Sequence, residues 1–529
     1  MKKKNILYTA GLMAAMCASL SSCDSFLDEM PDNRTEIDTE DKVVSLITSA
    51  YPTSAYIMLN EYMSDNTDDM GVRYANYTDR LVDQMYAWKD ITEEDNDSPY
   101  QLWQASYNAI ASANQALTSI EEMGGATTTT LKEAKAEALL CRAYNHFILV
   151  NEFCMNYNTT TSATDLGVPY MTKPETTVNP HYERGTVAGV YEQIDKDIQE
   201  ALPMIGDTHY TVPKYHFNMQ AAYAFASRFY LFYEKWSEAA RYANLCLGNN
   251  AKSMLRDWDE MQSYGETDNL TPRTNLYIDA ADPSNLLLIG AISSAGVVAS
   301  NYIVLTKYTH DKYLASSEDV NASNIWGDIN YIRCRALNFQ GGSMDRMFIA
   351  RIPYLFEETD PVAQTGYRRT VYPAFKSDYL LLERAEAYIM MKEYDKACAD
   401  LTTWMQNFTT STMVLTPDKV VGYYKTMAYA TWDNPTLKKH LHPAFAIDEE
   451  GSTQECMLQC VLNFKRIETG YEGLRWFDIK RYGINIVRRT MDSGGNPLEK
   501  TDSLTTNDLR RAIQLPQTVI RTGITANPR

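Results

Sequence analysis

The sequence predicts a mainly α-helical protein in which paired helices form a scaffold and a loop-rich lobe contains short strands. Apolar residues recur at three- and four-residue steps along much of the chain, the spacing of amphipathic helices. Two distant segments share a helix–turn–helix pattern, and the stretch between them is rich in Asn, Ser, Asp, Gly and Tyr. With 529 residues the chain is long enough to bury a sizeable core.

Three helices are predicted in the first third of the chain, over residues 41–50, 100–123 and 131–150. The third has two apolar stripes, which are formed by Leu139, Ala143, Phe147 and Val150 and by Leu131, Ala134, Ala138 and Cys141. A helix with two apolar stripes packs on both sides, as in stacked helical pairs.

Two later segments, residues 217–247 and 377–408, resemble each other. Each has a helix, a tight turn with an aromatic residue, and a second helix that opens with a small residue. This pattern is typical of tetratricopeptide helix pairs, in which the small residue lets two helices approach closely. Residues 131–152 and 190–202 are predicted to form a further pair. Long insertions separate the units, so a simple open solenoid is not expected.

Residues 251–370 differ in composition from the rest and include two strand-like runs, at 285–292 and 302–305. Loops carry function when a rigid scaffold positions them, so we predict a loop-rich lobe built onto a helical scaffold. The predicted organisation is a signal peptide (1–22), a lipid-anchored tether (23–40) and a body (41–529) with its scaffold at about 41–250 and 371–490 and its insertion at about 251–370.

The N-terminus has the pattern of a bacterial lipoprotein signal. Lys2, Lys3 and Lys4 precede a short apolar stretch that ends in Leu-Ser-Ser-Cys23. This ending fits a lipobox, so Cys23 is predicted to become the first mature residue and to carry acyl chains that anchor it to a membrane. The alternative is an ordinary secretory signal with a chance cysteine. Later apolar runs are too short to span a bilayer.

Charge and cysteine usage exclude several classes of protein. The formal net charge of −19 would repel nucleic acid and anionic lipid over most of the surface, so we expect no nucleic-acid partner. Seven cysteines follow Cys23, without regular spacing, which does not indicate a disulfide framework. Cys141, Cys246 and Cys398 are predicted to be buried free thiols. Cys456 and Cys460 would share one helix face, and a metal pair there is the less favoured interpretation.

Motifs that carry catalysis are not found in this sequence. It has no Gly-x-Ser-x-Gly elbow, no His-Glu-x-x-His and no phosphate-binding glycine loop. His440 and His442 fit a surface loop better than a metal site. Oxygen-rich clusters at residues 65–69 and 93–97 have ligand chemistry suited to calcium, but neither has EF-hand spacing. We therefore predict solvated loops there, no metal and no cofactor, with calcium as the weaker alternative.

Several segments together resemble the SusD/RagB family of Bacteroidetes surface lipoproteins. They are Cys23-Asp24-Ser25-Phe26-Leu27-Asp28, Ala136-Glu137-Ala138 through Arg142-Ala143-Tyr144, Asp165-Leu166-Gly167-Val168-Pro169-Tyr170, Tyr191 to Ile198, Glu383-Arg384-Ala385-Glu386-Ala387-Tyr388, and Gly473-Leu474-Arg475-Trp476-Phe477-Asp478-Ile479-Lys480-Arg481. The chain ends in Asn527-Pro528-Arg529, where family members commonly end in Asn-Pro-Gly-Tyr. The late block of Arg475, Trp476, Asp478 and Arg481 is interpreted as a charged and aromatic staple within the scaffold.

The resemblance implies a non-catalytic nutrient receptor on the outer membrane. Such proteins sit on a TonB-dependent transporter of the SusC type, capture glycans, or peptides in the RagB branch, and deliver them for import. Two other classes remain open at this point: a helical-repeat scaffold that binds only envelope proteins, and a lipid-anchored hydrolase. The sequence does not name the sugar, because the geometry of loops determines it.

The resemblance also implies where ligand contacts lie, namely in the loop before the 100–123 helix and in the middle lobe. Aromatic faces suit the C–H faces of sugars, and planar polar groups suit their hydroxyls. The predicted ligand-binding residues are Trp88, Trp326, Tyr77, Tyr86, Tyr331, Tyr277, Arg73 and Asn96, with Tyr74, Tyr313, Asp69, Asn76 and Asn324 as further candidates. Trp88 and Trp326 are the first choices, and we expect both to line one shallow site.

Overall fold

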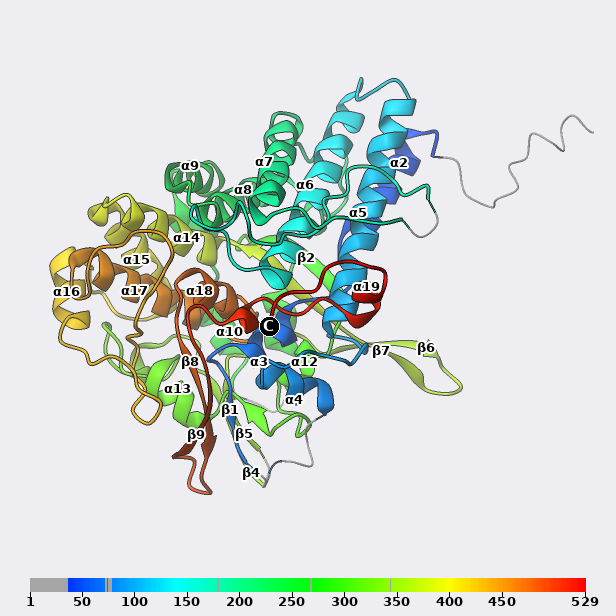
Figure 1. Ribbon diagram of the computed structural model, residues 1–529. Helices are drawn as coiled ribbons and strands as arrows, with labels where there is room; N and C mark the ends of the chain where they lie inside the picture. Colours follow the sequence, from blue (N-terminus) through cyan, green and yellow to red (C-terminus); the bar gives the residue numbers. More distant parts are fainter. Residues whose placement is uncertain (1–36, 72–73, 75–78, 178–179, 267–268, 343) are drawn as a thin grey trace, which may run out of the picture. The chain divides into compact units, whose positions relative to one another are not determined.

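The structure is a computed structural model (Figure 1). It describes residues 37–71, 74, 79–177, 180–266, 269–342 and 344–529. The predicted signal peptide and Cys23 lie outside the described residues, as do Arg73, Asn76 and Tyr77. Internal contacts separate residues 1–39 from a second unit, Glu40–Arg529, which contains all the elements given below.

The N-terminal part of this unit is helical, as predicted. Its helices are α2 (Glu40–Ile47) with a 3-10 turn (Thr48–Ala50), α3 (Ile57–Met63), α4 (Arg80–Tyr86), α5 (Pro99–Glu122), α6 (Thr129–Phe153) and α7 (Val187–Ala201). Ser98 caps α5, because its Oγ accepts a hydrogen bond from the backbone N–H of Gln101 at 3.3 Å. Nearly every residue of α6 after its first turn is buried, which confirms that this helix packs on two sides.

Two helical pairs confirm the predicted repeat. They are α8 (Met219–Phe232) with α9 (Trp236–Leu247), and α14 (Ser377–Met390) with α15 (Tyr394–Phe408). The turns match in detail, since Glu234 and Lys392 both have left-handed backbones, with φ of 59° and 61°. The small residues Ala239 and Ala397 are buried at the helix contacts. The helices α6 and α7 pack together as a further pair. The helix α14 packs on α8 and α9, and α17 (Thr453–Glu468) packs on α14 (Figure 1).

The remaining helices are short or lie toward the C-terminus. They are α10 (Trp258–Ser263), α11 (Thr271–Tyr277), α12 (Ala295–Val298), α13 (Lys312–Glu318), α16 (Pro417–Tyr424), α17 (Thr453–Glu468), α18 (Arg475–Arg481) and α19 (Gln517–Arg521). Those of the predicted loop-rich region, α10 to α13, have four to seven residues each. Such helices depend on packing rather than on intrinsic propensity.

The described residues also form three small sheets, with strand orders β3-β1-β8-β9, β2-β7-β6 and β4-β5. The strands are β1 (Asp68–Asp69), β2 (Asn285–Ile292), β3 (Tyr308–Thr309), β4 (Leu337–Gly341), β5 (Met344–Phe348), β6 (Leu355–Asp360), β7 (Thr365–Lys376), β8 (Ile486–Met491) and β9 (Pro497–Leu504). Figure 1 shows the β6–β7 and β8–β9 hairpins projecting from the helices.

One predicted strand is confirmed and one is wrong. Residues 285–292 form β2, which pairs antiparallel with β7. Residues 302–305 form no strand but a loop of bends. Their backbone carbonyls accept hydrogen bonds from the side chain of Arg346 rather than from a neighbouring strand.

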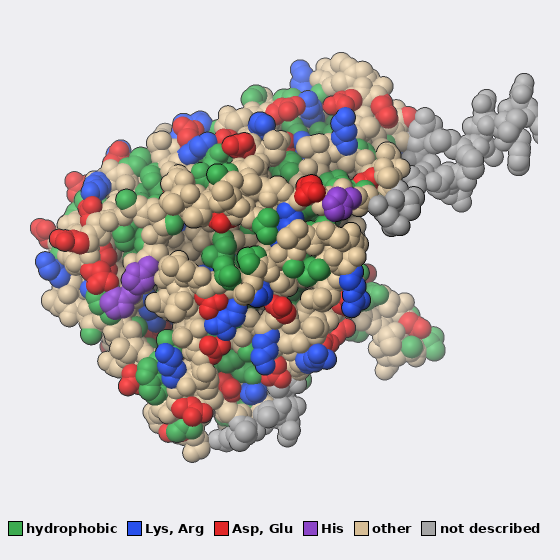
Figure 2. Space-filling model, viewed as in Figure 1, with side chains coloured by type: hydrophobic (Ala, Val, Ile, Leu, Met, Phe, Trp, Pro, Cys, Tyr) green, Lys and Arg blue, Asp and Glu red, His purple; other side chains and the backbone are tan. Residues whose placement is uncertain are grey.

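The seven cysteines of the body are all buried and free, as expected from their irregular spacing. Within the described residues, no helix combines the length and the apolar character needed to cross a membrane. On the face of the molecule in Figure 2, acidic and basic side chains are intermixed.

Candidate functional site

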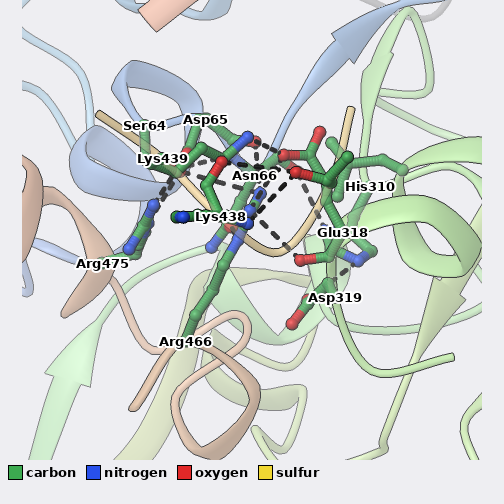
Figure 3. Close-up of polar contacts among 12 residues, drawn as sticks. Ser64, Asp65, Asn66, His310, Glu318, Asp319, Lys438, Lys439, Arg466 and Arg475 are labelled. Carbon is green, nitrogen blue, oxygen red and sulfur yellow. Dashed lines mark hydrogen bonds and ion pairs between the residues drawn. The ribbon is translucent and has the colours of Figure 1, made fainter. Parts of the chain in front are cut away.

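A cluster of buried charges lies beneath a cleft of about 240 Å³. Arg475 donates two hydrogen bonds of 2.8 Å to the carboxylate of Asp65. Arg466 donates to Asn66 Oδ1 at 2.8 Å, and its Nη1 pairs with Glu318 at 3.1 Å (Figure 3). Burial alone would raise the pKa of Asp65, but Arg466 and Arg475 outweigh burial and hold that pKa well below its usual range.

The rim of this polar cleft continues the same network. Arg489 binds Asp68 through two hydrogen bonds, of 2.9 and 2.7 Å, and donates to the carbonyl oxygen of Trp432 at 2.9 Å. Lys439 pairs with Glu318. The charged groups of the polar cleft therefore satisfy one another, and their main effect is to fasten α17, α18 and β8 to the segment after α3.

The block of Arg475, Trp476, Asp478 and Arg481 is the staple that the sequence indicated. All four side chains are buried. Lys465 lies between Glu386 and Asp478, with N–O distances of 2.8 and 2.6 Å, and Arg481 pairs with Glu386.

We predicted solvated loops at the two acidic clusters, and this prediction is wrong for Asp65, Asp68 and Asp97. Asp65 and Asp68 form the ion pairs described above, with arginines some 400 positions later in the chain. Asp97 is buried and accepts hydrogen bonds from the Ser293 hydroxyl and, at 2.8 Å, from the backbone N–H of Ser294. In the described part of the chain, no three His, Cys, Asp or Glu side chains come together as a metal site would require.

Trp88 and Trp326 do not line a shallow site, which corrects the first choice made from the sequence. Each is 3 % exposed. Trp88 donates from Nε1 to the carbonyl of Met63 at 2.8 Å, and Arg488 lies over its ring at 4.2 Å. Trp326 packs on Phe464 in an aromatic cluster, with ring centroids 5.3 Å apart. Polar sequence neighbours suggested exposure, but the folded chain turns both rings inward.

Most of the other predicted residues are also packed into the body. Tyr86 stacks on Tyr308, with ring centroids 4.2 Å apart, and the hydroxyl of Tyr277 donates a hydrogen bond to the carboxylate of Glu472. Further candidates are engaged as well: Tyr74 and Tyr313 contact a Met70–Met491 cluster, Asn324 donates to Asn463, and Asp69 accepts from the N–H of Gly71. Tyr331 and Asn96 are exposed and stay predictions.

A second cleft, of about 210 Å³, lies in the loop-rich region. Its walls come from α11, from α12 with the segment after it, and from the chain before β6. We call it the tyrosine–asparagine cleft, after Asn269, Asn275, Asn301, Tyr302 and Tyr354. Tyr302 is 45 % exposed, and the rings of Tyr302 and Tyr354 meet edge to face with centroids 5.2 Å apart.

Arg346, on β5, holds the loop that presents Tyr302. Its side chain is fully buried. Its Nη1 donates to the carbonyl oxygens of Val297, Ser300 and Tyr302, and its Nη2 to those of Val304 and Leu305, at 3.1–3.4 Å. The two terminal nitrogens of one planar guanidinium thus share their four hydrogens among five backbone carbonyls, which fixes the path of the loop.

The opposite wall of the cleft depends on close backbone packing. A Cβ atom at Gly296 would lie 2.2 Å from the carbonyl oxygen of Pro353, so only glycine lets α12 approach this segment. The hydroxyl of Thr370, on β7, donates to the same carbonyl at 2.9 Å. Asp97 holds the start of α12 from the other side through Ser293 and Ser294.

The chemistry of this cleft is that of a neutral binding site. The described residues that line it include no acidic or basic side chain and no His or Cys. They offer two phenol rings and amide groups that donate and accept hydrogen bonds. Sequence reasoning missed these residues because they come from three separate segments, although the enrichment of Asn and Tyr in residues 251–370 pointed to the right region.

The fold is a helical-repeat scaffold that presents a small, uncharged cleft on short loops. Residues 25–231 match the model of the SusD-like family described as starch-binding and associating with the outer membrane. Over these residues, which make up less than half of the chain, the sequence is similar to that family. A search of curated proteins found no match.

Solved structures of SusD superfamily proteins share the fold. One from Bacteroides thetaiotaomicron is 19 % identical, with a TM-score of 0.63, and the match covers 94 % of this chain and all of that one. One from Bacteroides fragilis is 15 % identical, with a TM-score of 0.60 and coverage of 93 % and 99 %. A SusD-like carbohydrate binding protein from Bacteroides vulgatus is 14 % identical, with a TM-score of 0.59 and coverage of 91 % and 95 %.

Proposed function

We propose that this protein is a non-catalytic receptor that captures neutral glycans in the tyrosine–asparagine cleft. The observation that carries the proposal is the cleft itself: two tyrosine rings and three asparagines meet in a lining without charge. A sugar ring can lie its C–H face on a phenol ring while its hydroxyls bond to the amides. A lining without charged groups favours a neutral sugar over a uronic acid, whose carboxylate would lack a cation to pair with.

The receptor acts at the outer membrane in this proposal. Cys23 carries the lipid anchor, and a SusC-type TonB-dependent transporter takes over the captured glycan. Support comes from the lipobox in the sequence and from the match of residues 25–231 to a family model described as associating with the outer membrane. Mass spectrometry of the mature N-terminus tests the anchor, and co-purification from membranes with a TonB-dependent transporter tests the partnership.

One observation favours a second candidate, a receptor for peptides. Ile303, Val304, Leu355 and Phe356 are exposed beside the cleft, with 37–54 % of their surface accessible. Exposed apolar residues next to a binding cleft suit apolar peptide side chains as well as they suit a protein partner.

Binding of the purified protein to a panel of polysaccharides, oligosaccharides and peptides distinguishes the two. Retention by one glycan class, with the glycan recovered uncut, is the expected result. Retention by peptides alone would replace the glycan proposal with the peptide one, and shortened glycan products would replace it with a hydrolase.

A further inference from the structure

An open groove of about 500 Å³ lies at the turn between α8 and α9, outside the tyrosine–asparagine cleft. Its rings belong to Tyr157, Tyr233, Trp236 and Phe445, and all four are partly exposed. Tyr157 meets Tyr233 edge to face with centroids 4.8 Å apart, and Trp236 meets Phe445 in the same way at 5.3 Å. This volume is within the range of small-molecule sites. We call it the aromatic groove.

Glu234 supplies the groove with a carboxylate that the protein leaves partly unsatisfied. Its Oε1 is shielded from solvent and has no hydrogen-bond donor among the described residues. Burial raises the pKa of Glu234 to about 7, and Arg481 only partly offsets this. The neighbouring Lys235 is engaged elsewhere, since its ammonium pairs with Asp195 at 2.8 Å and lies over the ring of Tyr233 at 4.0 Å.

The repeat offers an internal comparison for this residue. Lys392 occupies the matching position in the turn between α14 and α15, with nearly the same left-handed φ. Its ammonium pairs with Asp448 at 2.8 Å. Folding of such a turn favours glycine or asparagine, which adopt positive φ at low cost. A glutamate that keeps this backbone and lacks a partner for Oε1 is thus not explained by the turn alone.

We propose that the aromatic groove is a second carbohydrate-binding site, in which a sugar ring packs on Trp236 and Tyr233 and a hydroxyl donates to the carboxylate of Glu234. The inference rests on the proposed glycan receptor and deepens it. A polysaccharide that engages the groove and the cleft together gains affinity by raising the effective concentration of its second contact. The two sites share no lining residue.

The stoichiometry of oligosaccharide binding tests this inference. The probe is a tetrasaccharide of whichever polysaccharide retains the protein, measured by isothermal titration with the processed protein in detergent. We expect two tetrasaccharides per wild-type chain and one for Trp236→Ala. Glu234→Gln should weaken the groove site at least fivefold, because an amide accepts a sugar hydroxyl less strongly than a carboxylate does. Lys392→Gln, at the matching turn, is the control and should bind two.

Each other outcome is decisive. One tetrasaccharide per chain, lost in Tyr302→Ala and unchanged in Trp236→Ala, would overturn the second site and keep the proposed function. A single bound tetrasaccharide that is lost in Trp236→Ala and kept in Tyr302→Ala would support the aromatic groove as a binding site and overturn the proposed role of the tyrosine–asparagine cleft. No retention by any glycan would overturn both. Unchanged melting temperatures of the Glu234→Gln and Trp236→Ala variants show that the fold is intact.

Discussion

The guanidinium of Arg346 donates from Nη1 to the carbonyl oxygen of Tyr302 at 3.2 Å, which links a buried strand to an exposed ring of the cleft. Arg346 has no accessible surface, whereas Tyr302 is 45 % exposed. The ring is therefore positioned through its own backbone by a residue that no ligand touches. Pre-organisation of this kind lowers the entropy cost of binding.

Replacement of Arg346 tests this positioning. Arg346→Met removes the side-chain donor that the carbonyls of Ser300, Tyr302, Val304 and Leu305 share, whereas Val297 keeps a hydrogen bond from the Ser300 hydroxyl, and each group left buried and unsatisfied costs about 1–3 kcal/mol. The loop should relax toward solvent, with glycan affinity falling about tenfold or more and hydrogen exchange rising in this segment. Arg346→Lys keeps the charge but cannot reach all five carbonyls, so its glycan affinity should lie between those of the wild type and Arg346→Met. Wild-type affinity in Arg346→Met would contradict the assigned role.

Gly296 controls the distance between the two walls of the cleft. The Cβ of Gly296→Ala would lie 2.2 Å from the carbonyl oxygen of Pro353, so α12 and the 352–355 segment must move apart. Overpacking of this type costs about 1–3 kcal/mol of stability, and glycan affinity should fall with it. The control is Gly290→Ala, whose added Cβ has no neighbour within 4 Å. Equal melting temperatures and affinities for the two variants would contradict the close approach.

Asp97 should make stability depend on pH. Burial raises its pKa from 3.8 to about 6, so the folded state holds the proton more tightly than the unfolded chain does. Its stabilisation is full below about pH 4 and is lost as the pH rises through 6. Asp97→Asn has no ionisable group at this position, so it lacks this pH dependence. The unfolding free energy of the wild type relative to Asp97→Asn should thus be greater at pH 4 than at pH 7.5, by about 2–3 kcal/mol at 1.4 kcal/mol per pKa unit. If the stability advantage of the wild type over Asp97→Asn were larger at pH 7.5 than at pH 4, the result would contradict the raised pKa of Asp97.

Lys465 is the centre of the buried staple. It has no exposed surface and its ammonium lies within 2.8 Å of carboxylate oxygens of both Glu386 and Asp478. Lys465→Met removes one of the two cations that these buried carboxylates share, Arg481 being the other, and should cost about 3–5 kcal/mol in urea unfolding. Lys392→Met removes an exposed ion pair with Asp448, which solvent screens, and should change the unfolding free energy far less. Similar losses in the two variants would contradict the structural role of Lys465.

The helical part of the fold could be predicted from sequence because its signals are local. Apolar spacing gave the bounds of α5 and α6 to within a few residues, and the repeated turn motif identified the α8–α9 and α14–α15 pairs. The cleft could not be predicted in the same way. Its lining comes from residues 269–275, 296–302 and 352–355, and only folding brings these together. Two errors have the same origin. Asp65 was expected in solvent, but its partner Arg475 lies 410 positions later. Trp88 and Trp326 were expected at the surface, but the fold packs Trp88 against Arg488 and Trp326 against Phe464.

The central claim is that the tyrosine–asparagine cleft captures a neutral glycan, and the affinity of Tyr302→Ala for the retained glycan tests it most directly. Loss of the ring face should weaken binding about tenfold or more, equivalent to about 1.4 kcal/mol. An exposed side chain of this kind contributes little to stability, so the melting temperature should not change. Tyr264→Ala, which removes an equally exposed ring (45 %) outside the cleft, is the matched control and should bind as the wild type does. Unchanged affinity in Tyr302→Ala, or a loss in Tyr264→Ala instead, would contradict the account.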